Sequence, residues 1–181
     1  MENQNTIDQK PDKKSTLRVV VHSFFVVPFI IAIFGLMIFL VVRIMTSEPN
    51  TAQDYLEDVK IGGSTKRWQG AFELSKILSN PKLVPTDDRF VSEMISIFEY
   101  ASNDRDIRVR QYLAMAMGAT KDSRYVPPLL ASLDSPETEM IMASIHALGN
   151  IGDNGAVQPI INMLDHGEAK VRLQAVISLG K

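Results

Sequence analysis

The chain of 181 residues contains no cysteine, a single tryptophan and only three histidines. Without cysteine, the chain can form neither a disulfide bond nor a thiolate metal site. The histidines, His22, His146 and His166, are widely separated, so a metal ion would need imidazole and carboxylate ligands converging from distant segments. We therefore expect no metal site and no cofactor.

Familiar catalytic patterns are also missing. No Gly-x-Ser-x-Gly nucleophile turn occurs, and no glycine-rich phosphate loop follows a strand pattern or opens a helix with Gly-Lys-Ser/Thr. Acidic pairs such as Asp87-Asp88 are typical of helix N-termini and solvated faces. The chain is therefore not expected to be an enzyme.

The chain also lacks an excess of positive charge. Its formal net charge is -2, and 15 basic and 18 acidic residues follow residue 42. Nucleic-acid-binding surfaces depend on clustered Lys and Arg side chains that neutralise phosphates. We therefore expect no nucleic-acid partner.

One long segment, residues 19–42, has no Lys, Arg, Asp or Glu. As a helix it would measure about 36 Å, against a hydrocarbon core of about 30 Å. A cleaved signal peptide usually has a shorter apolar stretch that ends in a small-x-small site, whereas Arg43-Ile44-Met45-Thr46 follows here. We therefore predict a transmembrane helix at 19–43 that remains as an uncleaved anchor.

The flanks of this segment predict its orientation. Residues 1–18 are polar and without apolar periodicity, which is typical of a disordered tail. They contain Lys10, Lys13, Lys14 and Arg18, whereas Arg43 is the only base between the segment and Lys60. The positive-inside rule then places the N-terminus in the cytoplasm and the rest of the chain outside the cytoplasmic (inner) membrane, as in a single-pass protein.

A repeat dominates the remainder of the chain. Residues 44–65 are expected to be a juxtamembrane linker with a short helix at 52–59, capped by Thr51. Beyond them, shifting the sequence by 31 residues aligns Gly118 with Gly149 and Gly180. Each unit contains two helical patterns and no convincing strand pattern. This predicts an all-α solenoid at 66–181, with a half-repeat at 66–79 and helix pairs at 87–119, 122–150 and 153–180.

The connection between units contains three glycines, in the stretch from Gly149 to Gly155. Because no phosphate-loop context surrounds them, we interpret Gly149 as the positive-φ end of a second helix, with Asp153 or Asn154 capping the next. Pro128 and Pro159 are expected in the opening turns of the first helices. Small residues at 116, 147 and 178 would let neighbouring helices approach closely.

The 31-residue unit resembles the HEAT repeat, in the short variety also found in phycobilisome lyases. The matching residues are Val171-Arg172, Ala175, Leu179-Gly180, Asp153, Ala156-Val157, Pro159 and Leu164-Asp165. With its N-terminal apolar segment, the whole chain looks like single-pass bacterial HEAT-repeat proteins. The resemblance implies an α-solenoid but no particular activity, because helical repeats serve many partners.

The resemblance also implies a ladder of Asp–Arg hydrogen bonds between repeats. Asp165 and Arg172 fit that pattern, and Arg110 and Arg67 occupy the same repeat position as Arg172. The unit before Asp165 pairs Asp134 with Ile141 and would break the ladder.

The outward positions of the second helices are the remaining candidates for function. At 100° per residue, the positions opposite the apolar stripe hold Gln111, Met115, Met142, His146, Leu173 and Ile177. In HEAT solenoids these helices line the concave side, so these residues could form an apolar groove for a partner helix or peptide. Alternatively, the second helices are sandwiched between neighbours and the same residues are ordinary core. Exposure of Met115, Met142 and Leu173 distinguishes the two.

These observations together predict a membrane-anchored scaffold for protein–protein interaction, with an unidentified protein partner. The alternatives are an accessory subunit of an enzyme or lyase that binds a small ligand in the same groove, or a subunit of a membrane complex. Because the last second helix has an outer face as apolar as its predecessors, either that end of the solenoid is an interface or, as we expect, further repeats follow Lys181.

Overall fold

The computed structural model describes residues 22–46, 50–104 and 106–181, and the chain divides into two units, Met1–Pro49 and Asn50–Lys181. The predicted tail at 1–18 lies outside the described residues. In the first unit, a short π-helical turn, η1 (His22–Val26), leads into α2 (Val27–Thr46). Residues Phe24–Met45 form a helix long and apolar enough to cross a membrane, with a mean hydropathy of 3.1.

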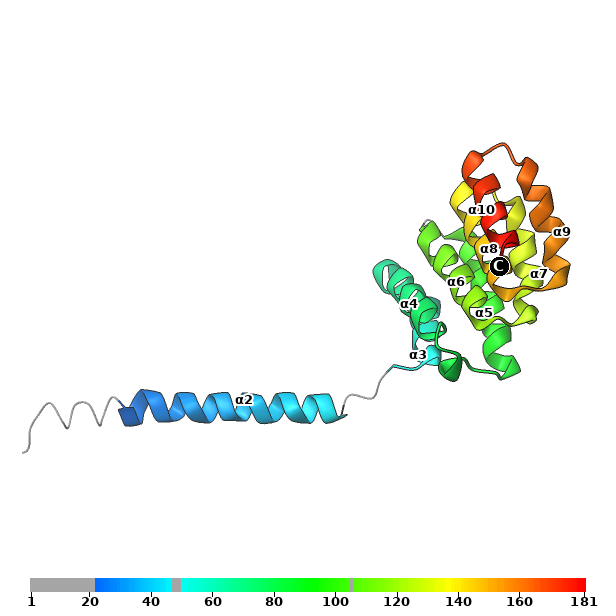
Figure 1. The fold of residues 1–181 in the computed structure, drawn as a ribbon. Coiled ribbons are helices and arrows are strands. Elements are labelled where there is room, and N and C mark those ends of the chain that lie inside the picture. Colours follow the sequence, from blue (N-terminus) through cyan, green and yellow to red (C-terminus); the bar gives the residue numbers. More distant parts are fainter. Residues whose placement is uncertain (1–21, 47–49, 105) are drawn as a thin grey trace, which may run out of the picture. The chain divides into compact units, whose positions relative to one another are not determined.

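The second unit consists of helices arranged in pairs (Figure 1). The first helices of the pairs are α3 (Ala52–Ile61), α5 (Asp88–Tyr100), α7 (Val126–Ala131) and α9 (Asn154–Asn162). The second helices are α4 (Ser64–Ile77), α6 (Ile107–Thr120), α8 (Thr138–Ile151) and α10 (Ala169–Leu179). Short 3-10 turns continue or connect them: η2 (Pro81–Leu83), η3 (Ala101–Asn103), η4 (Ser123–Tyr125), η5 (Ser132–Asp134) and η6 (Met163–Asp165). The predicted all-α solenoid is confirmed.

The first repeat is complete rather than half. Thr51 caps α3 through a capping box, in which its hydroxyl accepts a hydrogen bond from the Asp54 amide. Leu56 and Val59 of α3 are fully buried in the common core. The segment expected as a linker over 44–65 therefore contains the first helix of the solenoid, because the break at Gly62-Gly63 is tight enough to fold α3 back onto α4.

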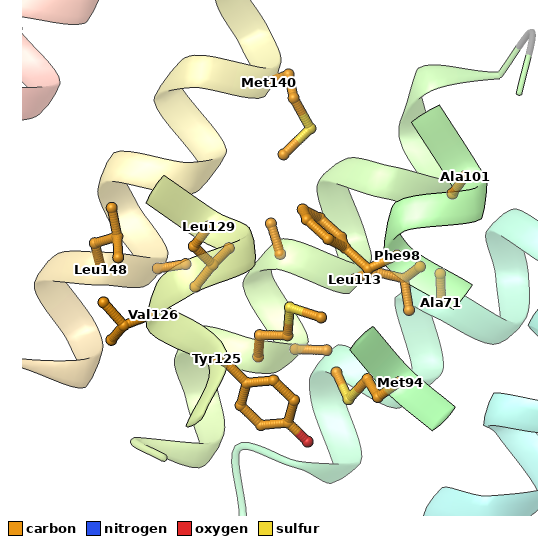
Figure 2. Close-up of a cluster of buried hydrophobic side chains, with 14 of the residues drawn as sticks. Ala71, Met94, Phe98, Ala101, Leu113, Tyr125, Val126, Leu129, Met140 and Leu148 are labelled. Atoms are coloured by element: carbon orange, nitrogen blue, oxygen red, sulfur yellow. The ribbon is translucent and has the colours of Figure 1, made fainter. Parts of the chain in front are cut away.

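The core lies between the layer of first helices and the layer of second helices. In α5, for example, the buried residues are spaced along one face: Phe90, Val91, Met94, Ile97 and Phe98. Figure 2 shows Phe98 of α5 beside Leu113 of α6 and, further along, Leu129 of α7 and Leu148 of α8. One continuous hydrophobic core therefore runs through the four pairs described within residues 50–181.

The second helices stack side by side, α4 on α6, α6 on α8 and α8 on α10. The predicted close approach at small residues occurs at two of these contacts. A Cβ built on Gly118 would lie 2.6 Å from the Cα of Ala147, and one built on Gly149 would lie 2.6 Å from the Cβ of Ser178. Gly118 and Gly149 therefore lie where one second helix crosses the next, and this explains why they are 31 residues apart.

This arrangement corrects the interpretation of Gly149. Helix α8 continues to Ile151, and the residue with positive φ is Gly152, at 73°. Asp153 then caps α9 as expected, accepting a hydrogen bond from the Gly155 amide at 2.7 Å. Because this cap starts α9 at Asn154, Pro159 falls inside the helix rather than in its opening turn, whereas Pro128 does lie at the start of α7.

The arginine ladder differs from the expected one. Arg172 donates to the backbone carbonyls of His166 and Gly167, both at 2.8 Å, and forms no ion pair with Asp165 among the described residues. The predicted Asp165–Arg172 pair is therefore wrong, because the carbonyls at the end of η6 lie closer to the guanidinium. Arg67 forms the inter-repeat bond instead, reaching Asp104 of the next pair at 2.6 Å.

Arg110, at the same repeat position, also reaches the next pair. Its guanidinium lies over the Phe98 ring, 5.0 Å from the ring centroid, and donates to the Ser132 hydroxyl at 3.3 Å. Burial lowers the pKa of Arg110, and Glu137 opposes that shift. The arginines thus tie adjacent pairs together, but through a carboxylate in one case and a hydroxyl in the other.

Candidate partner-binding groove

A hollow of about 330 Å³ lies on the face of the second helices, across α8. We call it the α8 groove and define it by its lining residues: Gln111 and Met115 of α6, Glu139, Met142, Ala143 and His146 of α8, and Gln174 of α10. The four α8 residues follow the 3.6-residue period and so occupy one face of that helix. Four of the six residues predicted from the sequence lie together here.

None of the six outward positions is fully buried, so they are not ordinary core, although Met142 packs partly against the core. Met115 is 41% exposed, and Leu173 and Ile177 are 62% and 49% exposed. Gln111, Met142 and His146 are intermediate. The second helices are therefore covered on their flanks by neighbouring helices but not on this face. Leu173 and Ile177 lie on α10 outside the α8 groove.

Three lining residues were not predicted: Glu139, Ala143 and Gln174. The first two lie three residues before and one residue after Met142, so a wider arc of the helical wheel would have included them. Gln174 aligns with Ala143 under the 31-residue shift. The prediction missed them because it included only the two positions of each second helix that lie opposite the apolar stripe.

The floor of the groove is apolar and its ends carry opposite charges. Met115, Met142 and Ala143 supply the apolar surface. Glu139 lies in the first turn of α8 and forms no ion pair within the described residues. At the other end of α8, Lys181 donates to the Asn150 side-chain oxygen at 2.6 Å and lies 3.5 Å from Nδ1 of His146.

His146 is half-buried at the basic end. Burial lowers its pKa, and the positive charge of Lys181 lowers it further. The lowered pKa favours the neutral imidazole, in which one ring nitrogen donates a hydrogen bond and the other accepts one. Such a group orients a polar contact without adding charge to the groove.

A second, larger hollow of about 820 Å³ lies at the turns between the helices of the first two pairs. Its charged residues neutralise one another: Arg67 pairs with Asp104, and Arg108 with Asp106. Hydrogen bonding from Arg108 keeps the pKa of Asp106 below its usual range. Each of these arginines thus has a carboxylate partner within the fold, which explains how the turns are held, although Oδ2 of Asp104 is buried without a hydrogen bond.

A comparison with protein families identifies the architecture. The family model of HEAT repeats matches residues 96–180. These repeats are HEAT repeats. The pairs at α5–α6, α7–α8 and α9–α10 contribute to the HEAT match, and α3–α4 precedes it in the same stack. No curated protein sequence matches the chain significantly.

Solved structures with similar HEAT-like architecture include the complex of CpcE and CpcF of phycocyanin lyase from Nostoc sp. PCC7120. It aligns with a TM-score of 0.57 and 19% identity, over 75% of this chain and 55% of that chain. An engineered protein aligns with a TM-score of 0.51 and 18% identity, over 72% of this chain and 61% of that chain. The chain thus spans little more than half the length of these proteins, and at such identity the likeness shows the fold alone.

Proposed function

We propose that this chain is a membrane-anchored HEAT-repeat scaffold whose α8 groove receives an apolar segment of a partner protein. The observation that carries the proposal is the partly exposed apolar floor of the groove, bounded by Glu139 at one end and Lys181 at the other. Repeat solenoids supply rigid extended surfaces of this kind. The anchor would concentrate that surface at the bilayer.

The anchor is the helix at Phe24–Met45. Its 22 residues correspond to about 33 Å, which covers the hydrocarbon core. Its apolar side chains are exposed on all sides in the structure, with Phe24 at 77% and Met45 at 81%, as expected for a helix solvated by lipid. The basic residues before it support an orientation with the N-terminus in the cytoplasm and the solenoid outside.

Charge complementarity specifies the occupant. Glu139 and His146 are seven residues apart on α8, so the charged ends of the groove are separated by about 10 Å. A partner helix with an apolar face, a basic side chain near Glu139 and a carboxylate near Lys181 fits both ends. Met115 and Met142 adapt to different apolar side chains, because the thioether chain is unbranched and polarizable. The partner is therefore a protein segment with one preferred direction in the groove.

Site-specific photo-cross-linking in native membranes tests the proposal. A photoreactive amino acid at position 142 is expected to give a discrete protein adduct, whereas the same residue at Ala131, exposed on α7, is expected to give none. Mapping the cross-linked peptide should find an apolar segment with a basic and an acidic flank. Equal adducts at both positions, or none at 142, would overturn the proposal.

The charge of the groove is tested in the same assay. Glu139→Lys should weaken the adduct at 142 by about an order of magnitude, since it places like charges together. Glu99→Lys on α5 adds the same charge at an exposed position outside the groove and should leave the adduct unchanged. If both substitutions act alike, the electrostatic assignment of the occupant is wrong.

The α8 groove is also close to the lower limit of volumes that hold small molecules. An accessory subunit of an enzyme or lyase that binds a small ligand would therefore use the same residues. A subunit of a membrane complex that packs through its anchor and its α10 surface is a third possibility. A small-molecule adduct at position 142 would favour the accessory subunit. Protein adducts from probes in the anchor and on α10, but not from position 142, would favour the subunit of a membrane complex.

A further inference from the structure

The six methionines of the second unit differ widely in exposure. Three of them are completely buried in the core: Met94, Met117 and Met140. Figure 2 shows Met94 and Met140 among the core side chains. Met142 and Met163 are partly buried and pack against that core. Met115 is the most exposed of the six, at 41%, so a reagent that attacks thioethers in the folded solenoid meets Met115 first.

This exposed thioether lies in the floor of the α8 groove. Met115 of α6 lines the groove together with Met142 of α8. Under the 31-residue shift, the positions equivalent to Met115 hold His146 and Ile177. The repeat fold therefore does not depend on a thioether at position 115.

The chain offers an oxidant no thiol, because it contains no cysteine. Peroxides then react with methionine, whose sulfide is oxidised to the sulfoxide. The sulfur lone pair attacks one oxygen of hydrogen peroxide, and a sulfur–oxygen bond forms as the oxygen–oxygen bond breaks. The other oxygen takes up the proton of the transferred oxygen and leaves as water. The sulfur is oxidised by two electrons, and the peroxide is reduced by two.

Oxidation of Met115 would change the chemistry of the groove floor. The thioether is apolar and polarizable, whereas the sulfoxide carries a polar hydrogen-bond acceptor. An apolar occupant would bury that oxygen against hydrocarbon, which weakens binding. Met117 and Met140 are shielded in the core, so the same exposure to peroxide leaves the packing of the solenoid intact.

We propose that Met115 is a peroxide-sensitive site in the floor of the α8 groove, and that its oxidation to the sulfoxide releases the apolar segment bound there. A reductase that supplies a dithiol would reverse the step, since the sulfoxide oxygen leaves as water while the dithiol becomes a disulfide. The release rests on the function proposed above. The selective oxidation of Met115 rests on its exposure and does not require a partner.

The selectivity is tested on the full chain in lipid nanodiscs, treated with hydrogen peroxide and followed by tandem mass spectrometry. Met115 should oxidise at least about ten times faster than Met117, which is completely buried two residues further along the same helix. In urea the two rates should become similar, because unfolding exposes both side chains. Equal rates in the folded chain would overturn Met115 as the sensitive site.

The release is tested by photo-cross-linking from position 142 in native membranes, as the ratio of adduct after and before peroxide. This ratio should fall about tenfold in the otherwise unchanged chain. With Met115→Leu the ratio should stay near one, whatever the starting amount of adduct. Met163→Leu removes a methionine outside the groove and is the matched control, in which the ratio should fall as in the unchanged chain.

The two halves of the proposal fail in different ways. If Met115 is oxidised but the adduct persists, release by oxidation is wrong. Loss of the adduct with Met115→Leu as well would place the sensitive group elsewhere and would also overturn it. Absence of any adduct before peroxide would contradict the occupied groove and the release with it, while the oxidation rates of Met115 and Met117 would still decide the sensitive site.

Discussion

Gly118 of α6 lies directly against Ala147 of α8, and a Cβ on Gly118 would approach the Cα of Ala147 to 2.6 Å. The contact is with backbone, which cannot move aside without separating the two helices. We therefore expect Gly118→Ala to destabilise the solenoid by about 1–3 kcal/mol through overpacking, although alanine favours the helix itself. Urea unfolding followed by the fluorescence of Trp68, the single tryptophan, measures this. Gly167→Ala, where nothing lies within 4 Å, should change stability by less than about 0.5 kcal/mol.

Lys121 is the non-glycine residue with positive φ, at 58°, among the described residues, and it occupies the C-cap of α6. Gly152 occupies the same position after α8. Lys121→Gly should therefore stabilise the chain by up to about 1 kcal/mol, and Gly152→Ala should destabilise it by a similar amount. The two changes in the free energy of unfolding should have opposite signs. Equal signs would contradict the left-handed assignment.

Arg67 and Asp104 connect the first two repeats, with side chains only 15% and 19% exposed. Arg67 also donates from Nε to the Val59 carbonyl at 2.7 Å, whereas Oδ2 of Asp104 is buried without a hydrogen bond. Arg67→Met should cost about 2 kcal/mol, because it leaves a poorly solvated carboxylate unpaired. Adding Asp104→Asn should recover part of that loss in a double-mutant cycle.

The exposed pair Lys76–Glu73 provides the control for that experiment. Lys76→Met should cost less than about 1 kcal/mol, since exposed ion pairs contribute little. If Arg67→Met costs no more than Lys76→Met, the inter-repeat bond is not a structural requirement.

The stability of the solenoid is expected to depend on pH through His146. Burial first, and then Lys181, lowers the pKa of His146 in the folded chain. A lowered pKa means that the folded state binds this proton less readily than the unfolded state does, so His146 contributes stability that is present above about pH 6.5 and lost as the pH falls below it. Lys181→Met should raise the pKa of His146 in an NMR titration, whereas Lys121→Met should not. An unchanged pKa after Lys181→Met would show that the lysine does not act on the imidazole.

The sequence predicts the periodic parts of this fold well, because burial recurs with the helical period and the repeats recur every 31 residues. It predicts the ends of helices poorly. Gly149 and Gly152 are the same residue type three positions apart, yet one allows α10 to approach and the other turns the chain. Only the neighbouring helix distinguishes them, and residue identity does not specify where that helix lies.

The candidate site could likewise be predicted only in part from the sequence. The exposure of Met115 and Leu173 depends on how widely successive second helices diverge on one face, which a helical wheel does not contain. The partner of Arg172 was mispredicted because backbone carbonyls are acceptors that the sequence pattern does not display. The floor of the groove could be found from spacing, but its charged ends could not.

Because the chain has no cysteine, a single introduced thiol reports its own surroundings, and this allows the most direct test of the proposed scaffold. Met142→Cys and Ala131→Cys variants are labelled with a membrane-impermeant maleimide, first in intact cells and then after purification in detergent. We expect Ala131→Cys to be labelled in both states, because the solenoid is proposed to lie outside the cytoplasmic membrane. We expect Met142→Cys to be protected in cells, where the partner would occupy the groove, and labelled after purification. Equal labelling of the two variants in cells would contradict an occupied groove, and labelling of neither until the cells are broken would contradict the orientation.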